Sequence, residues 1–157
     1  MAANSTIAAQ ENGKLRSSVG IGLTGVAIVI VVAAAFALRA FMLGGQSFWY
    51  DEGISVVMAP RDLATITANA SADIHPPLYY YILHFWVQLV GTSEFGARFL
   101  SVIYGVLLVP LVFQLGRRLF NREAGLAGAI VTAMAPFLVY YSQEARMYMQ
   151  VTTFAAL

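Results

Sequence analysis

Long apolar runs alternate with short polar segments along this chain. A run of about 20 apolar residues is long enough to cross the ~30 Å hydrocarbon core of a bilayer. The pattern predicts membrane spans at about 19–43, 98–116 and 124–143, and the start of a further span at 147–157. The chain is therefore predicted to be an all-α polytopic membrane protein.

The first apolar run follows two basic residues, Lys14 and Arg16. Positive charge stays on the cytoplasmic side of a membrane, so we place the N-terminus in the cytoplasm and interpret residues 1–18 as a disordered lead. A cleaved signal peptide is the alternative, because Ala35 and Ala37 are small enough for a peptidase site. Its apolar region would be only ~7–15 residues long, which favours a signal anchor.

Residues 77–91 form an apolar segment that is too short for a typical span and that contains His84 and Gln88. A basic cluster, Arg117 to Arg122, separates the second and third predicted spans. If residues 77–91 crossed the membrane, this cluster would face outside. We therefore predict an interfacial or re-entrant helix at 77–91, which leaves both basic flanks inside.

This arrangement places residues from about 44 to 98 outside the membrane, with short surface helices on either side of Pro60. His84 is expected to be a hydrogen-bonded packing residue. Pro136 inside a predicted span is tolerable because neighbouring helices can satisfy the carbonyl that it leaves without a donor, and its simplest role is a kink.

The composition agrees with this interpretation and excludes several functions. Hydrophobic residues make up 59% of the 157 residues and charged residues 11%, and the net charge is only +1. Such a balance provides no electrostatic footprint for nucleic acid. Cysteine is absent, which excludes disulfides and thiol nucleophiles, and no phosphate-binding glycine motif or nucleophile elbow is found.

Two adjacent acids, Asp51 and Glu52, follow three aromatic residues directly after the first span. A carboxylate that is partly desolvated by aromatic rings and repelled by its neighbour retains a proton more tightly, which makes it a competent general base for a hydroxyl. The alternative is structural: acids are favoured in the first turn of a surface helix by the helix dipole. These two residues alone do not decide between the alternatives.

Asp73 and His75 lie two residues apart, just before two prolines. They are weak candidates for metal ligands because this spacing lacks the specificity of a zinc motif. The sequence therefore indicates no definite cofactor, and a divalent metal ion is the candidate. The alternative is that Asp73 forms a turn or interacts with a helix dipole and that His75 is an ordinary surface residue.

Glu144 and Arg146 lie where the third span emerges, on the same side as the other acids. Charged groups at this depth are expensive and are functional-site hypotheses by default. The alternative is an ion pair that reaches the lipid headgroups. Arg39 and Arg98, each at a membrane boundary, are expected to reach lipid phosphates in the same way.

The ordered set of motifs resembles a known enzyme group. The segments are FWYDEGIS at 48–55, DIHPPLYYYILHFWVQLVG at 73–91, SEFGARFLSVIYGVLLVPLVFQLGRRLF at 93–120 and YYSQEARMYM at 140–149. Together they resemble the N-terminal region of the GT-C glycosyltransferases, in the group of protein O-mannosyltransferases and bacterial lipid A aminoarabinose transferases. The resemblance covers residues from about 20 to 157 and implies a GT-C-like transmembrane bundle with interfacial helices in the first external loop.

The resemblance implies a membrane glycosyltransferase at the outer face of the plasma membrane. Its donor would be a polyprenyl-phosphate-linked sugar, its acceptor a lipid, glycan or protein hydroxyl, and the transfer would be inverting. Asp51 matches the family's catalytic acid, with Glu52 beside it. Glu144, Arg146 and His75 are the candidates for substrate binding.

Members of this group continue through many more spans, so the 157-residue chain is expected to be inactive by itself. The alternative function is a small structural or transport subunit of the membrane, in which the external acids guide ions or bind a partner without catalysis.

Overall fold

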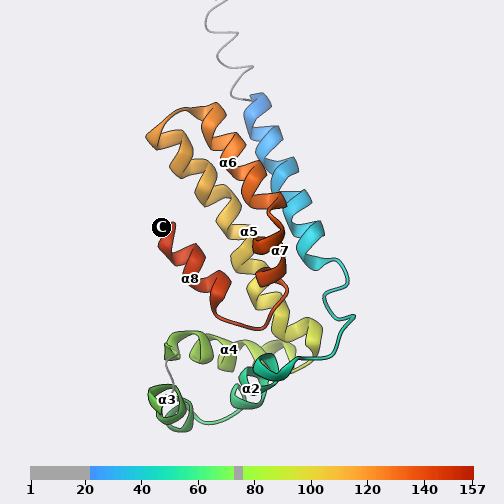
Figure 1. The fold of residues 1–157 in the computed structure, drawn as a ribbon, viewed down its shortest axis with the longest axis vertical. Helices are drawn as coiled ribbons and strands as arrows, with labels where there is room; N and C mark the ends of the chain where they lie inside the picture. Colours follow the sequence, from blue (N-terminus) through green and yellow to red (C-terminus); the bar gives the residue numbers. More distant parts are fainter. Residues whose placement is uncertain (1–21, 73–75) are drawn as a thin grey trace, which may run out of the picture.

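The computed structural model describes residues 22–72 and 76–157, and this part of the chain is helical, without strands. The all-α prediction is therefore confirmed. The helices, shown in Figure 1, are Gly22–Ala40, α2 (Tyr50–Met58), α3 (Leu63–Ala72), α4 (Pro77–Val90), α5 (Glu94–Leu119), α6 (Arg122–Met134), α7 (Pro136–Ser142) and α8 (Tyr148–Ala155).

Helix Gly22–Ala40 and α5 are long and apolar enough to cross a membrane, and the bent pair α6–α7 makes a third candidate span. These helices form an upright bundle, and α8 runs back up beside α5 from the lower end (Figure 1). The Thr153 hydroxyl of α8 donates a hydrogen bond to the Tyr104 carbonyl oxygen of α5 at 3.0 Å.

Glycine allows α5 and α6 to approach closely. A Cβ atom at Gly116 would lie 2.8 Å from the Gly125 Cα atom, and one at Gly125 would lie 2.5 Å from the Phe113 carbonyl oxygen. Without a hydrophobic drive between helices in lipid, such close packing is a main source of helix association.

The bend between α6 and α7 is 57° and lies at Pro136, as the proline predicts. Arg39 packs against this bend with none of its surface exposed, and its guanidinium donates to the carbonyls of Thr132 and Ala133, each at 2.9 Å. The expectation that Arg39 reaches lipid phosphates is therefore wrong. The guanidinium instead binds backbone carbonyls at the bend, where Pro136 provides no N–H donor.

Helices α2, α3 and α4 form a layer across the lower end of the bundle (Figure 1). Helix α4 begins at Pro77, where the missing N–H costs nothing, and ends at Gly91, whose φ of 80° favours glycine. His84 lies 2.8 Å from the Ala59 carbonyl oxygen through Nδ1, so its predicted packing role is confirmed. A core between this layer and α5 is made by Ala59, Ile66, Ala70, Tyr79, Tyr80, Leu83, Val87 and Leu100.

Candidate active site

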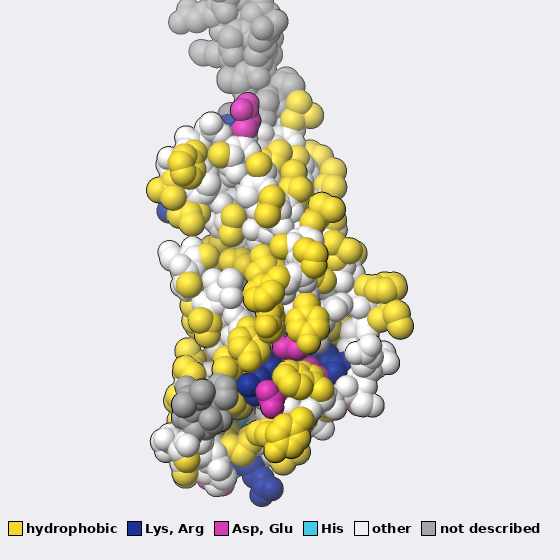
Figure 2. All heavy atoms as spheres, in the orientation of Figure 1, with side chains coloured by type: hydrophobic (Ala, Val, Ile, Leu, Met, Phe, Trp, Pro, Cys, Tyr) yellow, Lys and Arg dark blue, Asp and Glu magenta, His cyan; other side chains and the backbone are white. Residues whose placement is uncertain are grey.

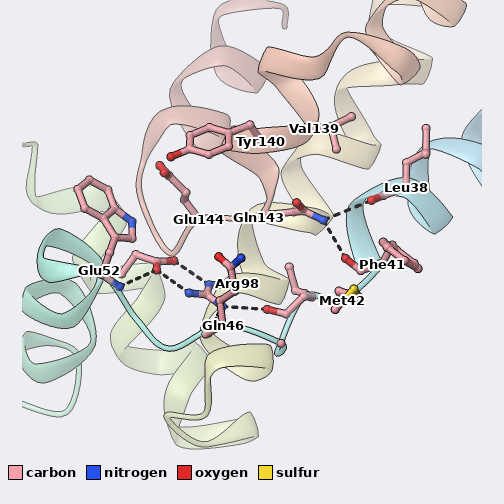
Figure 3. A pocket seen from close by; sticks show the side chains of 13 residues that line it. Leu38, Phe41, Met42, Gln46, Glu52, Arg98, Val139, Tyr140, Gln143 and Glu144 are labelled. Carbon is pink, nitrogen blue, oxygen red and sulfur yellow. Dashed lines mark hydrogen bonds and ion pairs between the residues drawn. The ribbon is translucent and has the colours of Figure 1, made fainter.

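Polar side chains meet at the lower end of the bundle, where α2, the start of α5 and the loop at residues 143–147 come together. Figure 2 shows acidic and basic side chains gathered there within a largely apolar face. A cavity of about 510 Å³ opens beside them (Figure 3). Its lining comprises Leu38, Phe41, Met42, Leu43, Gly45, Gln46, Trp49, Glu52, Arg98, Val139, Tyr140, Gln143 and Glu144.

Glu52 is the most enclosed acid of the site, with 1% of its surface exposed. Its Oε1 atom accepts from Arg98 Nε at 2.9 Å and from the Ala145 N–H at 2.8 Å. Its Oε2 atom accepts from Arg98 Nη2 at 2.7 Å and from the Trp49 N–H at 3.4 Å. Both oxygens are therefore occupied, and this carboxylate connects α2, α5 and the 143–147 loop.

Arg98 is 6% exposed and forms a two-point pair with Glu52. The same guanidinium donates to the carbonyls of Leu43 at 3.0 Å, Gln46 at 2.8 Å and Ser47 at 3.2 Å. Its planar arrangement of donors matches this set of acceptors, which an ammonium group would not. The expectation that Arg98 reaches lipid phosphate is wrong, because its donors are used inside the protein.

Asp51 differs from its neighbour, because successive residues of a helix point about 100° apart. Its side chain is 37% exposed, and Oδ2 lies 3.7 Å from Arg146 Nη2. Arg146 Nη1 also donates to the Asp51 carbonyl oxygen at 3.4 Å. The structure therefore separates the two adjacent acids into an accessible carboxylate and a buried one.

Glu144 is 6% exposed and lines the cavity. Burial raises the pKa of Glu144 above the ordinary 4.5, while a hydrogen bond from Tyr140 and the charge of Arg146 oppose the rise. Figure 3 shows the Tyr140 hydroxyl directed toward the Glu144 carboxylate. Glu144 Oε2 is buried and accepts no hydrogen bond from the described residues.

Arg146 lies on the other side of the 143–147 loop and is 5% exposed. Its guanidinium carbon lies 5.8 Å from the centre of the Tyr148 ring, a cation–π distance. Together with the Asp51 pair, this contact fixes a positive charge beside the accessible carboxylate. The structure therefore brings together four of the predicted site residues: Asp51, Glu52, Glu144 and Arg146.

The two remaining predicted site residues, Asp73 and His75, lie outside the described residues. Within the part of the chain that the structure describes, no group of three His, Cys, Asp or Glu side chains is placed to hold a metal ion.

Sequence reasoning missed two contributors to the site. The sequence predicts that Arg98 contacts lipid, although charged residues in membrane segments also pair with one another. Gln143 was not singled out. Its Nε2 atom donates to the carbonyls of Phe41, Arg39 and Leu38 at 3.0, 3.2 and 3.3 Å. Nothing in its sequence surroundings indicates such distant acceptors.

A family model described as dolichyl-phosphate-mannose-protein mannosyltransferase matches residues 74–157, which is more than half of the chain. The matched region contains α4 to α8 and therefore Arg98, Glu144 and Arg146. No curated protein and no solved structure matches the chain.

Proposed function

The chain belongs to the dolichyl-phosphate-mannose-protein mannosyltransferase family, and from this premise we propose that it moves a sugar from a polyprenyl-phosphate carrier to a hydroxyl group. The family description favours mannose as the sugar and a protein as the acceptor. The apolar helices beside the site suit a donor with a long lipid tail.

The proposed reaction is an inverting displacement. The acceptor oxygen attacks the anomeric carbon, the bond from that carbon to the phosphate oxygen breaks, and its electron pair leaves with the lipid phosphate. Asp51 accepts the proton that the acceptor hydroxyl loses. The new glycosidic bond therefore forms on the face opposite to the departing phosphate.

The different surroundings of the two adjacent acids are the observation that carries this assignment. Glu52 already accepts from four donors, so its oxygens are not available to a hydroxyl. The Asp51 carboxylate is accessible and has Arg146 nearby at 3.7 Å. We assign Asp51 as the base and Glu52 as the residue that fixes the shape of the site.

Glu144 is proposed to bind substrate. Its raised pKa favours the protonated form, which can donate a hydrogen bond as well as accept one. In the cavity it lies beside Tyr140 and Gln143, both of which carry groups that bind sugar hydroxyls. Arg146 is proposed to keep the Asp51 carboxylate oriented toward the acceptor.

The site is proposed to face outward from the plasma membrane, with the N-terminus in the cytoplasm. Helix α5 starts beside the site and ends with Arg117 and Arg118, so the basic cluster lies at the opposite end of the bundle. Short basic loops remain in the cytoplasm. This distribution of charge supports an outward-facing site.

The test is sugar transfer in membranes from cells that express the chain together with the further spans that members of this group contain, because the 157-residue chain alone is expected to be inactive. The substrates are labelled polyprenyl-phosphate mannose and a serine- and threonine-containing peptide. Asp51→Asn keeps the shape of the side chain but removes its basicity, so transfer should fall by ~10²–10⁴-fold at equal protein abundance. Asp62→Asn is the matched control, because Asp62 is an exposed acid of the same segment that bonds locally to Thr65.

Near-parental transfer by Asp51→Asn would remove Asp51 from the role of base. If Glu144→Gln then abolished transfer, the base would be Glu144 instead. Absence of transfer by the parent protein with any polyprenyl-phosphate sugar would refute the proposed donor class.

A further inference from the structure

Arg39 is a charged residue buried at the end of the first helix, outside the proposed catalytic contacts. None of its surface is exposed. Besides the Thr132 and Ala133 carbonyls, it donates from Nε to Ser142 Oγ at 3.1 Å and from Nη1 to the Ala35 carbonyl at 3.2 Å. One guanidinium therefore contacts both arms of the bent pair α6–α7.

Two of these carbonyls are available to Arg39 because the helix is interrupted at Pro136. In a continuous helix the Thr132 carbonyl would accept from the N–H of residue 136, and proline has none. The bend also leaves the Ala133 carbonyl available to Arg39, which binds it at 2.9 Å. Ser142 is the last residue of α7, so Arg39 reaches from the bend to the point where the site loop begins.

The opposite face of this contact is a glycine on α5. A Cβ atom at Gly105 would lie 2.8 Å from Arg39 Nε and would overlap the Ser142 hydroxyl. Gln143, which follows Ser142, donates to backbone carbonyls at the end of the first helix. Hydrogen bonds therefore run in both directions between the first helix and the end of α7. Glu144 and Arg146 follow directly.

We propose that Arg39 is a positioning residue: it fixes the angle between α6 and α7 and thereby places the 143–147 loop. Glu144 and Arg146 are presented by this loop, and its Ala145 N–H completes the hydrogen bonding of Glu52. The effect of Arg39 on transfer rests on the proposed function, whereas its effect on loop placement does not.

The test measures distances between pairs of spin labels in the purified protein by pulsed electron paramagnetic resonance spectroscopy. The chain has no cysteine, so labels can be placed without other changes. One pair, at Tyr50 and Val151, reports the α2–α8 separation across the loop. A second pair, at Leu23 and Phe120, reports the far end of the bundle. All four side chains are exposed.

Arg39→Lys keeps the charge but cannot reach all four acceptors. It should shift and broaden the Tyr50–Val151 distance while the Leu23–Phe120 distance stays unchanged. Gly105→Ala should do the same with Arg39 still present, because it displaces the guanidinium from the other side. Arg61→Lys, at an exposed arginine, is the matched control and should change neither distance.

Parental Tyr50–Val151 distances in both Arg39→Lys and Gly105→Ala would overturn the proposal. A change in both label pairs would also overturn it, because that result indicates a general loss of packing. With active enzyme, Arg39→Lys should lower kcat by ~10²-fold, the cost of a ~1 Å misplacement, with little change in donor KM. Shifted label distances together with undetectable parental transfer would reject the proposed function and retain the positioning role.

Discussion

Removing the charge of Glu52 should lower the free energy of unfolding more than the small change in side-chain structure suggests. The perturbation is Glu52→Gln, which keeps the size of the side chain but replaces one acceptor oxygen with a donor NH₂ group. In either orientation that group would face both a nitrogen of Arg98 and a backbone N–H, and each of these is itself a donor. The buried guanidinium would lose its countercharge.

The size of the effect follows from the burial of the pair. Breaking a buried ion pair by removing one partner costs about 3–5 kcal/mol, mostly because the other charge stays buried. Three backbone carbonyls would still accept from Arg98, which places the expected loss near the lower end, about 3 kcal/mol. The double variant Glu52→Gln/Arg98→Met removes both charges, so its loss should be about 2 kcal/mol smaller than the sum of the single losses.

The assay is unfolding in mixed micelles, with the free energy of unfolding obtained from a titration with sodium dodecyl sulfate and followed by circular dichroism. Glu123→Gln is the matched control, because Glu123 is an exposed acid in the first turn of α6. Its loss should be limited to a helix-dipole contribution of ~0.3–1 kcal/mol.

Two results would refute this reasoning. A loss for Glu52→Gln no larger than that of Glu123→Gln would mean that the pair does not stabilise the fold. Single losses that add in the double variant would mean that Glu52 and Arg98 act independently. Either result would also weaken the distinction between Glu52 as a structural acid and Asp51 as a base.

Three further predictions concern packing, protonation and orientation. Gly125→Ala should lower the free energy of unfolding by ~1–3 kcal/mol in the same titration, because its Cβ atom would meet the α5 backbone, whereas Gly25→Ala, with open space around it, should not. Burial raises the pKa of Glu144, so as pH rises above 4.5 the unfolded chain loses this proton before the folded chain does. The free energy of unfolding should therefore fall as pH rises. If Glu144→Gln showed the same dependence of the free energy of unfolding on pH as the parent, the fall could not be assigned to Glu144. Cysteines at Thr92 and Asn121, exposed at opposite ends of α5, should differ in intact cells: an impermeant thiol reagent should label Thr92→Cys and not Asn121→Cys, and the reverse pattern would invert the proposed orientation.

Several parts of the fold could be predicted because they depend on local pattern. Helix α5 (Glu94–Leu119) contains the apolar run predicted as a span at 98–116 and extends beyond it at both ends, and α4 is bounded by Pro77 and Gly91 as predicted. The prediction that Asp51 and Arg146 lie on the same side of the membrane follows from the number of spans and from the rule that a short basic loop remains in the cytoplasm. These inferences need only hydropathy, charge and residue-specific backbone preferences.

The assignments within the site could not be predicted, because they depend on contacts between distant residues. Arg39 and Arg98 were expected to contact lipid, yet Arg98 pairs with a residue 46 positions away and Arg39 with one 103 positions away. Sequence spacing also does not indicate which of two adjacent acids turns inward. That choice is made by the position of Arg98 when α2 packs against α5.

The separation in sequence of the buried partners sets an order of assembly during synthesis. Arg98 leaves the ribosome 46 residues after Glu52, so their charges can neutralise each other while only two hydrophobic segments have been made. The Ala145 N–H arrives 93 residues after Glu52. Arg39 must wait at least as long for its distant acceptors, because Thr132, Ala133 and Ser142 follow it by 93 to 103 residues. Until then its guanidinium, which lies near the end of the first helix, must extend toward the headgroups to remain solvated. We therefore expect the first helix to enter the bilayer early and Arg39 to turn inward only after α6 and α7 have been made.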